Sequence, residues 1–155
     1  MYSLRLLASK NARVFEIAYN LFDPIVRVLS PLWRGIGYAR IEKPFAVFEV
    51  WSKGLMFDCQ MCGKCILSST GMSCPMNCPK NIRNGPCGGV KANGNCEVDP
   101  DMRCVWVDAW AGSQQMKGGD KIKTIQPPVD YSIQGTSAWL RHVRDDLAAK
   151  DGNGA

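Results

Sequence analysis

A run of three thiols stands near the middle of this 155-residue chain, in the stretch Cys59-Gln60-Met61-Cys62-Gly63-Lys64-Cys65. A two-residue spacer lets the backbone turn tightly around a small inorganic core, and three cysteines so spaced are typical of ferredoxin-type cluster motifs. Each of the three can hold a different iron atom of one 4Fe–4S cube. This stretch therefore predicts a fold built around metal.

The remaining cysteines follow at wider spacing, and all eight lie between residues 59 and 104: the other five are Cys74, Cys78, Cys87, Cys96 and Cys104. Cys74 and Cys78 are each followed by proline, as is the cysteine that closes ferredoxin-type motifs. Eight thiolates suit two 4Fe–4S clusters. We therefore expect all eight cysteines to be metal ligands.

The two proline-linked cysteines leave the division of the ligands open. We expect Cys78 to complete the site of Cys59, Cys62 and Cys65, because Pro79 matches the closing motif. The second site would then take the other four cysteines: Cys74, Cys87, Cys96 and Cys104. The exchange of Cys74 and Cys78 stays open, because in two-cluster ferredoxins the cysteine before proline serves the other cluster.

Disulfide bonds and zinc sites are the alternatives to two clusters for the eight thiols. A disulfide framework needs an oxidising compartment, and the stretch before Lys10 has no apolar run typical of a signal peptide. Zinc is the stronger alternative. Zinc sites usually take their four cysteines from two separate pairs, however, and the triplet Cys59, Cys62 and Cys65 has one cysteine more than such a pair. One cluster plus one four-cysteine zinc site also remains open, since the later cysteines are widely spaced.

Composition excludes several classes of function. The formal charge of +5 is spread along the chain and forms no dense basic stripe for nucleic acid. No apolar run reaches the length of a membrane span, and we expect a cytoplasmic protein. No glycine-rich nucleotide motif is present, and the sole histidine, His142, is far in sequence from the cysteines. We expect no catalytic residue, and no cofactor-binding residue besides the metal ligands.

The chain divides into three predicted parts. Residues 1–54 form a helical, partner-docking segment, residues 55–110 a cysteine-rich metal domain, and residues 111–155 a tail with a short helix. In the middle part, Asn93-Gly94 is typical of a two-residue hairpin turn. The predicted fold class is a small, metal-stapled, loop-rich, irregular α+β domain with N-terminal helices, a short β-hairpin and ferredoxin-type cluster motifs.

Apolar residues recur at helical spacing in the N-terminal part: Val14, Ile17, Ala18, Leu21, Phe22, Ile25, Val28 and Leu29. Pro24 interrupts this stripe, so we expect two helices or one kinked helix over about 10–22 and 24–30. The stripe either covers the metal core of the same chain or docks onto a partner protein.

Several longer motifs resemble the methylenetetrahydrofolate reductase C-terminal-type family. They are Phe57–Cys65, Ser73-Cys74-Pro75-Met76-Asn77-Cys78-Pro79-Lys80, Arg83-Asn84-Gly85-Pro86-Cys87-Gly88-Gly89 and Cys96–Trp106. The resemblance covers about residues 55–110, with weaker similarity at Gln126-Pro127-Pro128 and at 137–140. Residues 1–50 show no recognisable feature of the family.

The resemblance implies a small partner of the flavin-containing reductase that interconverts methylene- and methyl-tetrahydrofolate. Flavin (FMN or FAD) and folate would lie on the partner, so this chain would be a non-catalytic subunit. Two functions follow as expectations. One is an iron–sulfur subunit that passes electrons from a ferredoxin-like donor to the flavin; the other is a structural or regulatory metal-binding subunit that stabilises the flavoprotein.

Overall fold

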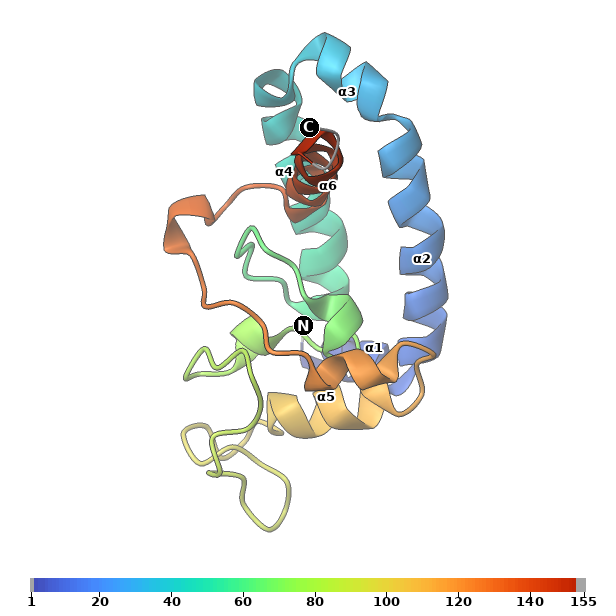
Figure 1. The fold of residues 1–155 in the computed structure, drawn as a ribbon. Helices are drawn as coiled ribbons and strands as arrows, with labels where there is room; N and C mark the ends of the chain where they lie inside the picture. Colours follow the sequence, from blue (N-terminus) through green and yellow to red (C-terminus); the bar gives the residue numbers. More distant parts are fainter. Residues whose placement is uncertain (1, 153–155) are drawn as a thin grey trace.

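Helices dominate the computed structural model, which describes residues 2–152. The α-helices are α1 (Tyr2–Lys10), α2 (Ala12–Val28), α3 (Ser30–Ile36), α4 (Tyr38–Phe57), α5 (Val105–Ser113) and α6 (Ala138–Gly152). Short 3₁₀ helices interrupt the loops: η1 (Leu67–Ser69), η2 (Pro75–Asn77), η3 (Gly119–Lys123) and η4 (Tyr131–Ile133). In Figure 1, α2 and α4 run alongside each other, and α3 joins them at one end. The cysteine-rich loops lie toward the opposite end.

The predicted α+β fold is wrong, because the described residues contain no sheet and no hairpin. Asn93-Gly94 does make a tight turn, in which the Gly94 N–H donates to the Lys91 carbonyl at 2.8 Å. Pairing beyond the turn stops at one isolated bridge, between Val90 and Cys96. The chain after the turn also pairs with a later segment, because the Cys96 N–H donates to the Met102 carbonyl at 2.9 Å and Asn95 forms a bridge with Arg103.

The metal-stapled character of that fold class is also corrected. Over residues 2–152, no group of three or more His, Cys, Asp or Glu side chains is arranged to hold a metal ion. The fold is instead organised by apolar packing among helices and loops. Its core consists of Ala8, Ala12, Phe57, Leu67, Met72, Cys74 and Met116. The core therefore lies where α1, α2 and the end of α4 meet the loop that follows the cysteine triplet.

Prolines lie within the N-terminal helices. A single helix, α2, continues through Pro24, so the alternative of one helix holds in place of two. Pro31 lies in the first turn of α3, where its missing N–H costs no helical hydrogen bond. No helix in the described part of the chain is long and apolar enough to cross a membrane.

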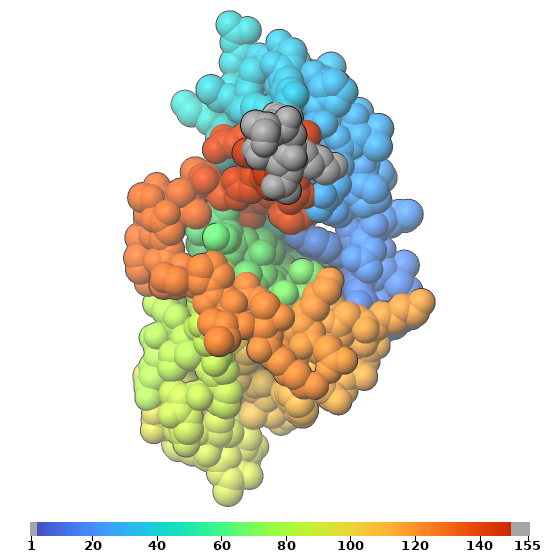
Figure 2. Space-filling view, viewed as in Figure 1, coloured from blue at the N-terminus to red at the C-terminus, as the bar shows by residue number. Residues whose placement is uncertain are grey.

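The C-terminal part folds back over the molecule. In Figure 2, the orange segment that follows α5 lies across the green loop of the cysteine triplet. The last helix, α6, packs against α2 and α4. It extends to Gly152, so the disorder expected from the sequence for residues 151–155 does not hold at 151 and 152. Residues 153–155 lie outside the described residues. The tail thus closes the open side of the α2–α4 pair.

Candidate functional site

Four cysteines line one small cavity near the core: Cys59, Cys62, Cys65 and Cys74, which we call the Cys59 group. The loop carrying them begins where α4 ends at Asp58, whose left-handed backbone (φ 53°) turns the chain away from the helix axis. Met61 (φ 47°) and Gly63 (φ 72°) turn it again between the cysteines. Three left-handed residues in so short a stretch wrap the chain around the cavity.

The other four cysteines line a second cavity: Cys78, Cys87, Cys96 and Cys104, which we call the Cys78 group. Trp106 forms part of its wall and donates its indole N–H to the Ile82 carbonyl at 3.0 Å. Cys87 is exposed, whereas Cys96 is buried. The Cys78 group is therefore the one that reaches the surface.

The 3₁₀ turn η2 separates the two proline-linked cysteines. Cys74 precedes the turn and Cys78 follows it, and the Cys78 N–H donates to the Pro75 carbonyl at 3.0 Å. Asn77 fixes the turn to the end of α4 by donating its side-chain N–H to the Phe57 carbonyl at 2.9 Å. As a result Cys74 lines the first cavity and Cys78 the second, the exchanged arrangement that the sequence left open.

The sulfurs of each group surround a cavity and do not converge on one point. All eight cysteines are free thiols. Backbone N–H groups point at two of the sulfurs: Met61 N–H lies 3.4 Å from Cys59 Sγ, and Gly89 N–H lies 3.4 Å from Cys87 Sγ. Four thiols around a cavity, with N–H donors aimed at sulfur, make a donor set that fits an iron–sulfur cluster.

Burial makes two thiols of the Cys59 group weak acids. It raises the pKa of Cys59 to about 11, against the opposing hydrogen bond from Met61. Burial, together with the neighbouring sulfurs of Cys59 and Cys65, raises the pKa of Cys74 to about 12. Because metals bind the thiolate, a bound centre must displace protons from these two sulfurs and stabilise their charge.

A buried guanidinium faces the Cys59 group. Arg83 lines the same cavity and is 5% exposed. Its Nη1 donates to Cys62 Sγ at 3.7 Å, and its Nη2 donates to the Lys64 carbonyl at 2.9 Å. The Nε atom is buried and has no hydrogen-bond partner among the described residues.

Glu49, which also lines this cavity, belongs to a buried ion pair. Lys53 Nζ lies 2.6 Å from Glu49 Oε1, and the two side chains are 2% and 1% exposed. The other oxygen of Glu49 accepts a hydrogen bond from Ser137 Oγ at 2.7 Å, and Lys53 Nζ lies 4.1 Å above the ring of Trp139. Burial alone would lower the pKa of Lys53, but the negative charges of Cys65 and Glu49 raise it above its ordinary value.

Sequence reasoning did not identify Arg83, Glu49 or Lys53 as site residues. One signal for the pair was present, because Glu49 and Lys53 are the only charged residues between Pro44 and Phe57 and stand four apart. Residues at that spacing lie on one face of a helix. Arg83 gave no comparable signal, since its position depends on how the loop after Cys78 folds.

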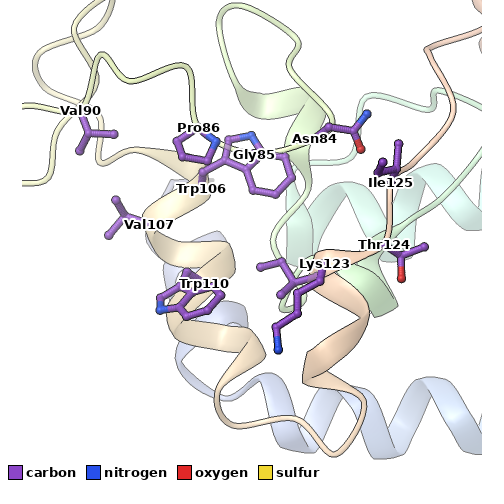
Figure 3. Close-up of a pocket in the computed structure, with 11 residues that line it drawn as sticks. Asn84, Gly85, Pro86, Val90, Trp106, Val107, Trp110, Lys123, Thr124 and Ile125 are labelled. Atoms are coloured by element: carbon purple, nitrogen blue, oxygen red, sulfur yellow. The ribbon is translucent and has the colours of Figure 1, made fainter.

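An apolar cavity of about 440 Å³ adjoins the Cys78 group. Figure 3 shows Trp106 and Trp110 projecting from α5 into it, with Pro86 above and the chain at Lys123–Ile125 opposite. Trp106 lines both this cavity and the second cysteine cavity. Trp110 instead lines the apolar cavity alone and is 53% exposed.

The predicted apolar stripe of α2 lies mostly on its outer face. Its members there are 52–76% exposed: Val14, Ile17, Leu21, Ile25 and Val28, which we call the α2 outer stripe. Phe22 belongs to the inner face, where its ring centroid lies 4.6 Å from that of Trp139. The helix is therefore apolar on two sides, and only one of them is covered by this chain.

Comparison with known proteins gave one family match. The family model described as "Methylene-tetrahydrofolate reductase C terminal" matches residues 38–132. The matched segment begins with α4 and contains both cysteine groups as well as Glu49, Lys53 and Arg83, whereas α1, α2, α3 and α6 lie outside it. No curated protein and no solved structure matches the chain.

Proposed function

Because this chain belongs to the methylene-tetrahydrofolate reductase C-terminal family, we propose that it is an iron–sulfur electron-transfer subunit of a flavin-containing methylenetetrahydrofolate reductase. The observation that carries the proposal is the division of eight cysteines into two sets of four, each around its own cavity. The Cys59 group would hold one 4Fe–4S cluster and the Cys78 group a second. Such clusters, when bound, accept and release single electrons.

The surroundings of the two groups suit different positions in a relay. The Cys59 group is joined to the apolar core through Cys74 and Cys65; Cys74 is buried and the other three cysteines are half-buried. The Cys78 group includes the exposed Cys87, beside which Lys80 and Glu97 form a surface ion pair. An external donor or acceptor would therefore meet the Cys78 group first, and the Cys59 group would lie behind it.

The flavin and the folate would lie on the partner protein, and the α2 outer stripe is the surface we assign to that contact. Monomeric proteins rarely leave so continuous an apolar face in water. The stripe lies outside the segment that the family model matches, so it belongs to this chain's own N-terminal helices. Because the stripe runs along α2, the flavoprotein could bind it without any rearrangement of the cysteine loops.

The test is metal analysis of the chain purified anaerobically with its flavoprotein, joined to electron paramagnetic resonance (EPR) of the reduced complex. Two clusters predict about eight iron atoms and eight acid-labile sulfides per chain. The complex should oxidise a reduced viologen or ferredoxin, and the flavoprotein alone should do so poorly. Serine at Cys62 should abolish that route and leave the complex assembled.

A structural subunit is the alternative, and the wide spacing of the Cys78 group favours it because such spacing also suits a zinc site. Zinc in place of iron in both groups, or equal viologen oxidation by the flavoprotein with and without this chain, would overturn the relay. Zinc in the Cys78 group alone would leave the Cys59 group as the only redox centre.

A further inference from the structure

Arg83 is a buried cation, and its hydrogen-bond partners among residues 2–152 carry no full negative charge. It is 5% exposed, and it donates to a thiol sulfur of Cys62 and to the backbone carbonyl of Lys64. A guanidinium carries a full positive charge on a planar group with five N–H donors, so its burial calls for several acceptors. A buried charge without an opposite charge is strongly unfavourable.

The unpartnered Nε of Arg83 adds a second sign that something is bound beside it. A buried donor without an acceptor is unfavourable, because it has lost its hydrogen bond to water. Arg83 lines the cavity of the Cys59 group and already contacts Cys62 Sγ, so thiolates at that cavity can supply the negative charge. Four thiolates on a metal centre make it anionic, and one-electron reduction makes it more negative by one charge.

The Lys53–Glu49 pair differs from Arg83 because it is neutral as a unit. Its atoms are 2.6 Å apart, and Glu49 is fixed from its other side by Ser137 of α6. Glu49 lines the same cavity as Arg83. Of the three buried charges around the Cys59 group, the Arg83 cation is therefore the one left without compensation.

We propose that Arg83 is the charge-compensating residue of the Cys59 group and raises the reduction potential of the centre held there, with Glu49 acting in the opposite direction by neutralising Lys53. The inference rests on the proposed function, since it concerns a redox centre at these four cysteines. Potentials of iron–sulfur centres respond to net charge and to hydrogen bonds on the sulfurs, and Arg83 supplies both.

The cation described beside the Cys78 group is placed differently. Lys80 Nζ lies 3.6 Å from Cys87 Sγ but is already paired with Glu97, and both side chains are about 40% exposed. Solvent screens such charges strongly. Lys80 is therefore a matched control. It is a cation next to a cysteine of the other group, but its charge is paired with Glu97 and exposed to solvent.

The experiment is an EPR-monitored titration of the anaerobically purified complex, with dithionite as the electron source. The Cys62→Ser variant first identifies the signal that belongs to the Cys59 group. Arg83→Met should then retain iron and shift the midpoint of that signal to lower potential, while Arg83→Lys should keep it close to wild type. Lys80→Met should leave this midpoint unchanged.

Glu49→Gln provides a test that does not depend on the Arg83 variants. It keeps an acceptor for Ser137 but leaves Lys53 uncompensated, so the same midpoint should move upward. If Arg83→Met retains its iron and its midpoint potential is unchanged, the inference is overturned. If Arg83→Met loses its iron, an unchanged midpoint potential in Glu49→Gln overturns the inference instead. A wild-type chain without any reducible iron signal overturns the proposed function, and the inference falls with it.

Discussion

Gly71 and Gly112 are in backbone contact, because a Cβ atom at Gly112 would overlap the carbonyl oxygen of Gly71. Gly71 itself has a left-handed backbone (φ 59°), and a Cβ there would overlap the carbonyl oxygen of Ala109. Gly71 belongs to the loop that carries Cys74, and Gly112 to the helix that follows Cys104. This contact therefore joins the segments of the two cysteine groups.

The first prediction is that Gly112→Ala destabilises the protein by roughly 1–3 kcal/mol, because the added methyl pushes α5 away from the loop. Gly54→Ala is its control: Gly54 is also helical, and nothing lies within 4 Å of the position of its Cβ. That variant should gain up to about 1 kcal/mol from helix propensity. Urea unfolding of both variants measures the difference; equal effects would mean that the contact is not close.

The second prediction concerns acid stability through Glu16. Burial opposes ionisation of Glu16, but the backbone N–H groups of Gly118 and Lys117, each 2.8 Å away, and the Arg13 guanidinium hold its pKa below the ordinary value of 4.5. A carboxyl with a lowered folded pKa contributes stability above the unfolded pKa, and that contribution disappears as pH falls through the folded value.

Glu16→Gln should accordingly cost roughly 1–3 kcal/mol at pH 7, since the hydrogen bonds lose their charge. The difference from wild type should shrink as pH falls below about 4.5, where the wild-type carboxyl also becomes neutral. Denaturant unfolding across this pH range measures it. A difference that stays constant with pH would show that Glu16 acts through its shape and not its charge.

The third prediction separates the exchanged cysteines. Cys74→Ser should remove the same spectroscopic signal as Cys62→Ser, because both side chains line the first cavity. Cys78→Ser should remove the signal that Cys96→Ser removes. Iron content and EPR of the four variants decide this. If Cys78→Ser and Cys62→Ser instead remove the same signal, Cys78 belongs with Cys59, Cys62 and Cys65, as the proline motif predicts.

The fourth prediction concerns the partner surface. Leu21→Asp with Ile25→Asp should weaken co-purification with the flavoprotein while iron content stays at the wild-type level, because both side chains are more than half exposed. Phe22→Asp should instead destabilise the fold, since Phe22 packs on Trp139. Its loss of stability should exceed about 2 kcal/mol.

The control for that surface is Trp51 on α4, which is 68% exposed and lies within the segment matched by the family model. Trp51→Asp should leave co-purification unchanged. If Trp51→Asp releases the flavoprotein and the α2 variants do not, the partner binds the family segment rather than the N-terminal helices.

Local features of the fold could be predicted from the sequence, because they depend on neighbours in the chain. The helical stripe after Lys10 and the turn at Asn93-Gly94 are both present. The hairpin was wrong because a turn fixes only its own residues. Whether strands extend from it depends on competing acceptors, here the carbonyl of Met102.

The sequence by itself determined the family and the eight cysteines that are expected to bind metal. Only the tertiary structure decided which four thiols share a cavity, because Cys74 and Cys78 have the same local motif and η2 directs them to different sides. It likewise decided that Lys53 and Arg83 are buried. A lysine in a helix and an arginine in a loop are exposed by default, and here α6 and the cysteine loop cover them through contacts from residues distant in sequence.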